Sequence, residues 1–362
     1  MLPLVNGEFE TLTPYVPGKP VSETERELGI TGVIKLASNE NPLGPSPKAM
    51  EAVAAAIPSL HDYPDGGAFY LKQALADFHG VQPEQLVIGN GTNEVIEMVI
   101  RTCLRPDENL LYVQSSFIVY KLCTLSLGRS IKEVPLTNHR YDLDAVADAI
   151  DERTKLVFIA NPNNPTGTYV TRDELKTFLK KIPDHVLVVL DEAYSEYVTA
   201  EDFPNGLQYL SDRERLMVTR TFSKCYGLAG LRIGYGISHA PLIDYINRGR
   251  QPFNCNTLAQ VAALAALKDT EHLRRSRELN ASEMTRVTPQ LEALGLGVTP
   301  SQANFLLVDF HRDAGEVFQK LMKLGVIVRP MGGYGLTTCA RITLGTESQN
   351  DTLLRVLPEA LS

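Results

Sequence analysis

Short apolar runs alternate with amphipathic stretches between residues 86 and 240, and this alternation limits the possible fold more than any other feature of the chain. In the stretches Thr92–Leu104, Asp142–Ile150 and Thr171–Lys181, the apolar residues have helical spacing. Seven apolar runs have the length of strands: Leu86–Ile88, Asn109–Val113, Ile131–Val134, Lys155–Ala160, Val186–Leu190, Leu216–Thr219 and Ile233–Ile237. Such alternation is typical of a mostly parallel sheet with helices on both faces. The sequence therefore predicts an α/β fold whose large domain contains a mostly parallel, seven-stranded sheet.

The pattern changes after residue 255. Helices are predicted there at Thr257–Leu267, Glu271–Leu294 and Ala314–Leu324, and a further helix at the C-terminus. Strands are predicted at Asn304–Phe310, Val326–Arg329 and Ala340–Leu344. This α+β order predicts a second, smaller domain. The first 40 residues are rich in proline and glycine and lack a periodicity that would anchor them to the large sheet. We therefore expect an N-terminal arm with part of the small domain at 1–45, the large domain at 46–255 and the small C-terminal domain at 256–362.

Composition excludes several classes of function. A formal net charge of −8 argues against binding to nucleic acid or to an anionic membrane surface. No apolar run approaches the roughly 18 residues that span a bilayer, and the N-terminus lacks the pattern of a secretory signal. The five scattered cysteines predict reduced thiols in a cytoplasmic protein, and the seven histidines lack the spacing of metal ligands. We therefore expect a cytoplasmic protein that binds small molecules and no metal.

Three segments place polar residues at the ends of predicted strands, where ligands bind in open α/β sheets. Gly89–Glu94 joins a strand to a helix and offers free N–H groups suited to one phosphate, although a plain strand–helix turn also explains it. Asn161–Gly167 encloses three asparagines between prolines and a glycine, a stiff turn that can hold an amide toward a ligand. Asp191 directly follows the run Val186–Leu190. A carboxylate at the mouth of a buried strand implies a cationic partner, or alternatively a helix N-cap.

The fourth segment, Thr221–Arg232, contains a single lysine among hydroxyls, glycines and apolar residues, with an arginine eight positions after it. A lysine in such surroundings can have a lowered pKa and act as an amine nucleophile. Hydroxyls with an arginine suit a phosphate. Together, the four segments supply an amine, a carboxylate, donors to an oxygen and a phosphate cradle, which are the groups that pyridoxal phosphate requires.

The chain resembles the fold-type I pyridoxal-phosphate aminotransferases, and within them the branch that acts on histidinol phosphate. The resemblance runs along nearly the whole chain. Besides the four segments, it is carried by Pro14–Pro20, Leu36–Pro47, Tyr63–Gly66, Leu231–Tyr235, Val328–Pro330 and Arg341–Thr346. One departure is Ser115-Ser116, where many relatives have Pro-Thr before the aromatic residue that stacks on the cofactor.

The resemblance implies roles for individual residues. Lys224 would bind the aldehyde of pyridoxal 5'-phosphate and later carry a proton, Asp191 would hold the pyridine nitrogen, and Tyr194 with Asn164 would bind the phenolic oxygen. Phe117 would stack on the ring. Residues around the phosphate would be Gly91, Thr92, Asn93, Thr221, Ser223 and Arg232, together with Tyr63 from a neighbouring subunit. The last of these implies a homodimer with shared sites.

Substrate contacts are implied at Arg341, which would receive the anionic end of the substrate, and at Tyr15, Asn41 and Arg329. The implied reaction is transamination between histidinol phosphate and 2-oxoglutarate, giving imidazole-acetol phosphate and glutamate in histidine biosynthesis. Because an arginine fork binds either carboxylate or phosphate, an aromatic amino acid or phenylalanine aminotransferase stays open, as does a lyase similar to threonine-phosphate decarboxylase. Residues expected to serve packing or solvation instead are Cys225, His61, Tyr235, Tyr334 and, as a helix-end charge, Glu192.

Overall fold

The computed structural model describes residues 5, 7–10, 12, 14 and 18–362. Its large sheet has the strand order β2-β8-β7-β6-β5-β3-β4. The bounds are β2 Leu86–Gly89, β3 Asn109–Val113, β4 Ser130–Val134, β5 Thr154–Ala160, β6 Leu187–Asp191, β7 Leu216–Thr221 and β8 Gly234–Ser238. Within this sheet, β8 runs antiparallel to its neighbours β2 and β7, and the other pairs are parallel. The predicted α/β class and the seven-stranded, mostly parallel sheet are confirmed.

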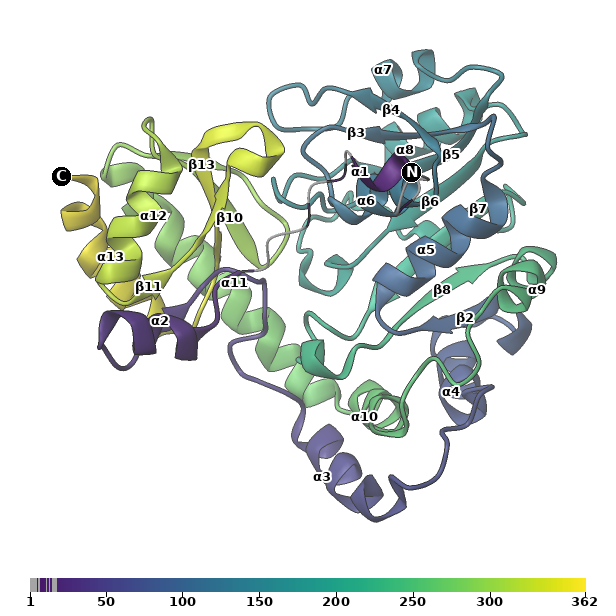
Figure 1. Ribbon diagram of the computed structural model, residues 1–362, viewed down its shortest axis with the longest axis horizontal. Coiled ribbons are helices and arrows are strands. Elements are labelled where there is room, and N and C mark those ends of the chain that lie inside the picture. Colours follow the sequence, from purple (N-terminus) through teal and green to yellow (C-terminus); the bar gives the residue numbers. More distant parts are fainter. Residues whose placement is uncertain (1–4, 6, 11, 13, 15–17) are drawn as a thin grey trace.

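Helices cover both faces of this sheet, as Figure 1 shows. In the central strand β5, Leu156 and Phe158 pack on one face, and Val157 and Ile159 on the other. The first face is covered by α5 (Thr92–Cys103), α6 (Val119–Ser126) and α9 (Ala240–Arg248). The second is covered by α3 (Pro47–Ala56), α4 (Phe69–His79), α7 (Leu143–Asp148), α8 (Arg172–Lys181) and α10 (Thr257–Leu267). Burial on both faces explains why the strand sequences are continuous apolar runs.

A smaller, four-stranded antiparallel sheet has the order β12-β13-β10-β9. Its strands are β9 Gly297–Thr299, β10 Phe305–Asp309, β12 Arg329–Met331 and β13 Leu336–Thr343, and it packs with α11 (Thr270–Ala293), α12 (Ala314–Lys323) and α13 (Glu347–Leu361). Beside it, the short strand β1 (Ile34–Lys35) pairs in parallel with β11 (Val326–Ile327) and brings the early part of the chain to this unit. Two short helices, α1 (Gly7–Glu10) and α2 (Val21–Leu28), precede β1. The domain boundaries at residues 45 and 255 stay a prediction.

The structure corrects one predicted strand. Val326–Arg329 is not a single element, because β11 ends at Ile327 to pair with β1, whereas β12 begins at Arg329 to pair with β13. Val328 is buried between the two. The backbone before this residue pairs in one sheet and the backbone after it pairs in another, so the single apolar run contains two short strands.

In the part of the chain that the structure describes, no helix is long and apolar enough to cross a bilayer.

Candidate active site

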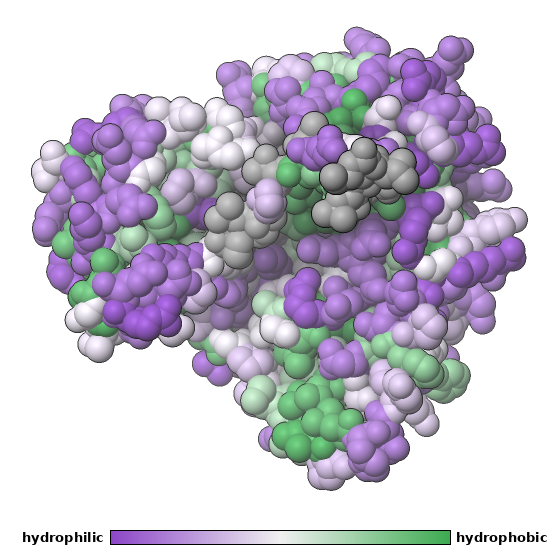
Figure 2. All heavy atoms as spheres, viewed as in Figure 1, coloured by the Kyte–Doolittle hydropathy of each residue, from purple (hydrophilic) through white to green (hydrophobic). Residues whose placement is uncertain are grey.

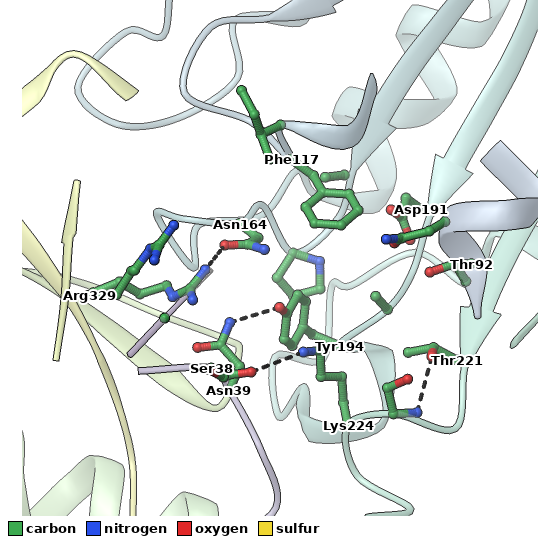
Figure 3. Close-up of a pocket in the computed structure, with 18 of the residues that line it drawn as sticks. Ser38, Asn39, Thr92, Phe117, Asn164, Asp191, Tyr194, Thr221, Lys224 and Arg329 are labelled. Carbon is green, nitrogen blue, oxygen red and sulfur yellow. Dashed lines mark hydrogen bonds between the residues drawn. The ribbon is translucent and has the colours of Figure 1, made fainter. Parts of the chain in front are cut away.

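A cavity lies at the carboxyl ends of β5, β6 and β7 and is closed on its other side by the segment 37–39 and the smaller sheet. Figure 3 shows Phe117 across the cavity from Lys224, with Asp191 and Asn164 on opposite flanks. The predicted residues that line it are Thr92, Asn93, Phe117, Asn164, Asp191, Tyr194, Thr221, Ser223, Lys224, Arg232, Arg329 and Arg341. Segments far apart in the sequence therefore meet around one space, as expected for polar residues at strand ends.

Asp191 is the last residue of β6 and is 4% exposed. Its carboxylate accepts hydrogen bonds from the Tyr120 hydroxyl at 2.7 Å and from Thr219 Oγ1 at 3.1 Å. Burial raises the pKa of Asp191, and these two hydrogen bonds act in the opposite direction. Among the described residues, no lysine, arginine or histidine forms an ion pair with this carboxylate. A buried carboxylate with neutral partners that faces a cavity is suited to a cationic group of a ligand.

Tyr120 was not predicted as a site residue. It is fully buried in α6, and its ring stacks on Phe158 at 4.6 Å and meets Phe117 edge-on at 5.6 Å. Its hydroxyl is therefore fixed in place where it donates to Asp191. This tyrosine connects the carboxylate and the aromatic wall of the cavity.

Replacing Tyr120 with phenylalanine is expected to lower kcat/KM by about 10- to 100-fold, the range for loss of a hydrogen bond to a charged group. Because the lost bond favours ionised Asp191, the acidic limb of the pH profile is expected to move to higher pH. Steady-state rates from pH 5 to 9 measure both effects. Tyr112→Phe is the matched control, since the Tyr112 hydroxyl donates to Glu133 outside the cavity. An unchanged profile in Tyr120→Phe would show that this bond does not tune the carboxylate.

Lys224 lies three residues beyond β7, and its Nζ donates to the Ser38 carbonyl oxygen at 3.3 Å. The same nitrogen lies 5.6 Å from the centroid of the Tyr194 ring. Burial, followed by the charges of Arg341 and Arg232, lowers the pKa of Lys224 to about 7. A large share of the amine is therefore unprotonated near neutral pH, as a nucleophile or base requires.

Residues predicted to surround a phosphate lie together near the N-terminus of α5. Arg232 Nη1 donates to Ser223 Oγ at 3.4 Å, and Thr221 Oγ1 accepts from the Ser223 amide at 3.1 Å. Gly91 has a φ of +76°, and a Cβ on it would lie 2.5 Å from Arg232 Nη2. A helix N-terminus, two hydroxyls and a guanidinium that packs against a glycine are groups suited to a phosphate.

Arg341 projects into the cavity from β13 and is 9% exposed. Its guanidinium donates to Asn164 Oδ1 at 2.5 Å and to the Ala37 carbonyl at 2.8 Å, and it lies 5.4 Å from the Phe305 ring centroid. Nε is buried and has no hydrogen-bond partner among the described residues. These neutral acceptors leave the charge of Arg341 uncompensated, so the cavity favours an anionic ligand.

Two predicted residues lie away from the cavity. The Asn41 amide donates to the Cys225 carbonyl and to Ser276 Oγ, both at 2.8 Å, so it connects the segment after Lys224 to α11. Tyr63 is 83% exposed and stacks on Phe253. Tyr15 falls outside the described residues.

Asn39 is a cavity residue that was not predicted from the sequence. Its amide donates to the Tyr194 hydroxyl at 2.8 Å, and its backbone N–H donates to Thr343 Oγ1 at 2.9 Å. Burial raises the pKa of Tyr194 to about 12, whereas Arg341 and the Asn39 hydrogen bond act in the opposite direction. Asn39 and Asn41 stand two positions apart in one polar segment, and no sequence pattern distinguishes the one that faces the cavity.

The prediction that Glu192 is a helix-end charge is wrong. Glu192 is 1% exposed, and its Oε2 accepts from Arg220 at 2.7 Å while its Oε1 accepts from the Gly206 amide at 2.7 Å.

Tyr334, expected to serve only packing, lines the cavity. Within the described residues, no group of three or more histidines, cysteines or acidic residues is placed to hold a metal ion.

Comparison with known proteins agrees with this geometry. The family model "Aminotransferase class I and II" matches residues 31–357. The chain is 51% identical to the histidinol-phosphate aminotransferase of Moorella thermoacetica, over 97% of this chain and 92% of that protein. It is 48% identical to histidinol-phosphate aminotransferase 2 of Pseudomonas aeruginosa, over 100% and 98% of the two chains.

Among solved structures, the histidinol-phosphate aminotransferase of Sinorhizobium meliloti in complex with pyridoxal-5'-phosphate superposes with a TM-score of 0.92. The two sequences are 29% identical, and the match covers 100% of this chain and 98% of that one. Similarity in sequence and in fold thus extends over the full length of the chain. The chain belongs to the class I and II aminotransferases.

Proposed function

We propose that this enzyme transfers an amino group from histidinol phosphate to 2-oxoglutarate, giving imidazole-acetol phosphate and glutamate. The observation that carries the proposal is that Lys224, Asp191 and Arg341 surround one cavity in a chain about half identical to proteins of that name. The cavity offers an amine of lowered pKa, a buried carboxylate and an uncompensated arginine. Together these are suited to proton transfer beside an anionic substrate.

The residues present fit pyridoxal 5'-phosphate as the cofactor. Asp191 meets the need for a carboxylate beside the pyridine nitrogen, and it has no cationic partner in the described chain that would compete. Arg232, Ser223 and the N-terminus of α5 would hold the phosphate. When bound, the cofactor draws electrons away from the amino-bearing carbon of the substrate. Phe117 lines the cavity on the side opposite Lys224, where its ring would cover one face of the bound cofactor.

Lys224 is suited to proton transfer, and Tyr194 is suited to hydrogen-bond donation. With a pKa of about 7, Lys224 Nζ can accept the proton from the amino-bearing carbon of the substrate and would deliver it to the carbon of the bound cofactor that takes up the amino group. Tyr194 keeps its hydroxyl proton at neutral pH because its pKa is raised to about 12, so it acts as a hydrogen-bond donor to an oxygen in the cavity. Asn39 holds that hydroxyl in position.

The two arginines of the smaller sheet favour a doubly charged substrate end. Arg329 and Arg341 lie directly opposite each other in the register of β12 and β13, and both line the cavity. A phosphate carries about 1.5 to 2 negative charges at neutral pH and offers three acceptor oxygens. A carboxylate offers fewer acceptors and one charge, so this pair supports the phosphate ester over an aromatic amino acid.

We further propose that the enzyme is a cytoplasmic homodimer in which Tyr63 reaches the cofactor phosphate of the second copy. Large apolar side chains are exposed on and near α3 and α4, among them Met50, Leu60, Tyr63 and Tyr70. Figure 2 shows apolar surface gathered at the α3 end of the molecule. An apolar patch of this kind is typical of a protein interface.

A paired assay of the purified enzyme tests the proposed reaction. With 2-oxoglutarate as acceptor, kcat/KM for histidinol phosphate is expected to exceed that for phenylalanine by about 10-fold or more, because one further charge-assisted hydrogen bond contributes about 1.5–3 kcal/mol. Lys224→Ala is the control for background turnover. A preference for phenylalanine would contradict the proposed substrate and indicate an aromatic amino acid aminotransferase. Release of CO2 from threonine phosphate without 2-oxoglutarate would contradict transamination and indicate a lyase.

A further inference from the structure

The loop between β3 and α6 contains a serine in an unusual backbone conformation. Ser115 has a φ of +51°, in the left-handed region that only glycine enters without cost. Ser115 and Ser116 lead directly to Phe117, which lines the cavity. A non-glycine residue in this conformation persists only where its surroundings hold it.

Hydrogen bonds from Asn163, which follows β5, and from Tyr141, which precedes α7, hold this loop on one side. Asn163 Nδ2 donates to the Ser115 carbonyl at 3.1 Å, and the hydroxyls of Ser116 and Tyr141 lie 2.7 Å apart. The Tyr141 hydroxyl also accepts from the Ala160 amide at the end of β5, at 3.2 Å. These bonds fix the position of the loop, and with it Phe117, relative to the carboxyl end of the sheet.

On its other side, the Ser115 side chain contacts the smaller sheet unit. Its Oγ donates to the carbonyl oxygen of Tyr334 at 2.7 Å. Tyr334 ends the turn Gly332–Tyr334, which connects β12 to β13 in the smaller sheet, and it also lines the cavity. Glycines at 332, 333 and 335 give this turn little conformational restraint of its own. The hydrogen bond therefore joins a well-anchored loop to an intrinsically flexible turn.

We propose that Ser115 is a positioning residue that fixes the Gly332–Tyr334 turn against the Phe117 loop and thereby sets the width of the cavity where the substrate binds. Ile118 and Tyr334 both line this cavity and also the adjoining one that extends toward α12. A change in their separation would alter the space for the side chain of the substrate. Lys224 and Asp191 lie on other elements and would keep their geometry. The inference rests on the proposed function, because it assigns the serine to substrate binding in that reaction.

The test compares Ser115→Ala and Ser115→Gly with the natural holoenzyme. Both variants remove Oγ, and loss of one hydrogen bond is expected to raise KM for histidinol phosphate by about 2- to 10-fold with kcat changed by less than about twofold. The absorbance spectrum of the bound cofactor should stay the same. Hydrogen–deuterium exchange of residues 332–335 should become faster in both variants, since the turn loses one of the contacts that hold it.

Ser126→Ala is the matched control, because the Ser126 hydroxyl donates within α6, to the Cys123 carbonyl at 3.0 Å. Its KM and exchange rates should equal those of the natural enzyme. The proposal is overturned if Ser115→Ala and Ser115→Gly keep both the natural KM and the natural exchange rate, or if kcat falls while KM stays constant. Exchange is measured without substrate, so it reports on the contact even if the natural enzyme does not turn over histidinol phosphate.

Discussion

Lys224→Ala is expected to reduce turnover by about 10⁴- to 10⁶-fold, the range for removing a nucleophile that also acts as the base. Among the described residues that line the cavity, no second lysine could replace it. The variant should also lose the visible absorbance that arises when the amine is joined to the cofactor. Turnover with histidinol phosphate and an absorbance spectrum of the purified protein measure the two effects.

Lys176→Ala is the matched control, since Lys176 lies on α8 and outside the cavity. Circular dichroism should be the same for both variants and the natural protein, because the hydrogen bond that Lys224 donates to Ser38 is a minor contribution to the fold. Activity within tenfold of the natural enzyme in Lys224→Ala would contradict the assignment.

In the natural enzyme, the rate at which pyridoxal phosphate joins the apoprotein should rise as the pH increases through about 7, where the amine loses its proton.

Asp191→Asn is expected to retain part of its cofactor but lose about 10²- to 10⁴-fold in kcat, because the electrostatic stabilisation of charge in a buried site contributes strongly to catalysis. The amide has nearly the shape of the carboxylate and can keep its contact with Thr219 and Tyr120. It carries no charge, so it cannot stabilise a protonated pyridine nitrogen. Single-turnover rates at saturating cofactor separate this loss from a loss of binding.

The control for this variant is Asp151→Asn, because Asp151 pairs with Lys132 at the opposite edge of the sheet from the cavity mouth. That change should leave kcat unaltered. If Asp191→Asn retained the natural kcat at saturating cofactor, the carboxylate would have no electronic role. A variant that bound no cofactor at any concentration would instead show that Asp191 serves mainly to hold it.

Much of the site could be predicted because it lies at the ends of strands. Parallel strands bring their carboxyl ends to one edge, so the segments after β5, β6 and β7 had to meet. This principle places Asn164, Asp191 and Lys224 together without knowledge of any loop. The same apolar runs identified all seven strands of the large sheet.

What escaped prediction depends on contacts between distant segments. Arg220 lies beside Glu192 because Asp191 is paired with Thr219 in the β6–β7 register, and this register is not fixed by either strand alone. Asn39 enters the cavity because its backbone is bound to Thr343 in β13. Tyr120 is three residues beyond Phe117 in the sequence, and only the approach of α6 to the end of β6 gives its hydroxyl a partner.

The pairing of early and late segments has a consequence for synthesis. Asn39, which lines the cavity, leaves the ribosome early. Thr343, which accepts the hydrogen bond from the Asn39 backbone, is 304 residues further along the chain. At about 5–20 residues per second, roughly 15 to 60 s separate the emergence of the two. During this interval the large sheet can form with Lys224 already in place, while Arg341 and the smaller sheet do not yet exist. A cofactor that binds the nascent chain would meet an open half-site, and substrate recognition begins only when the last strand is made.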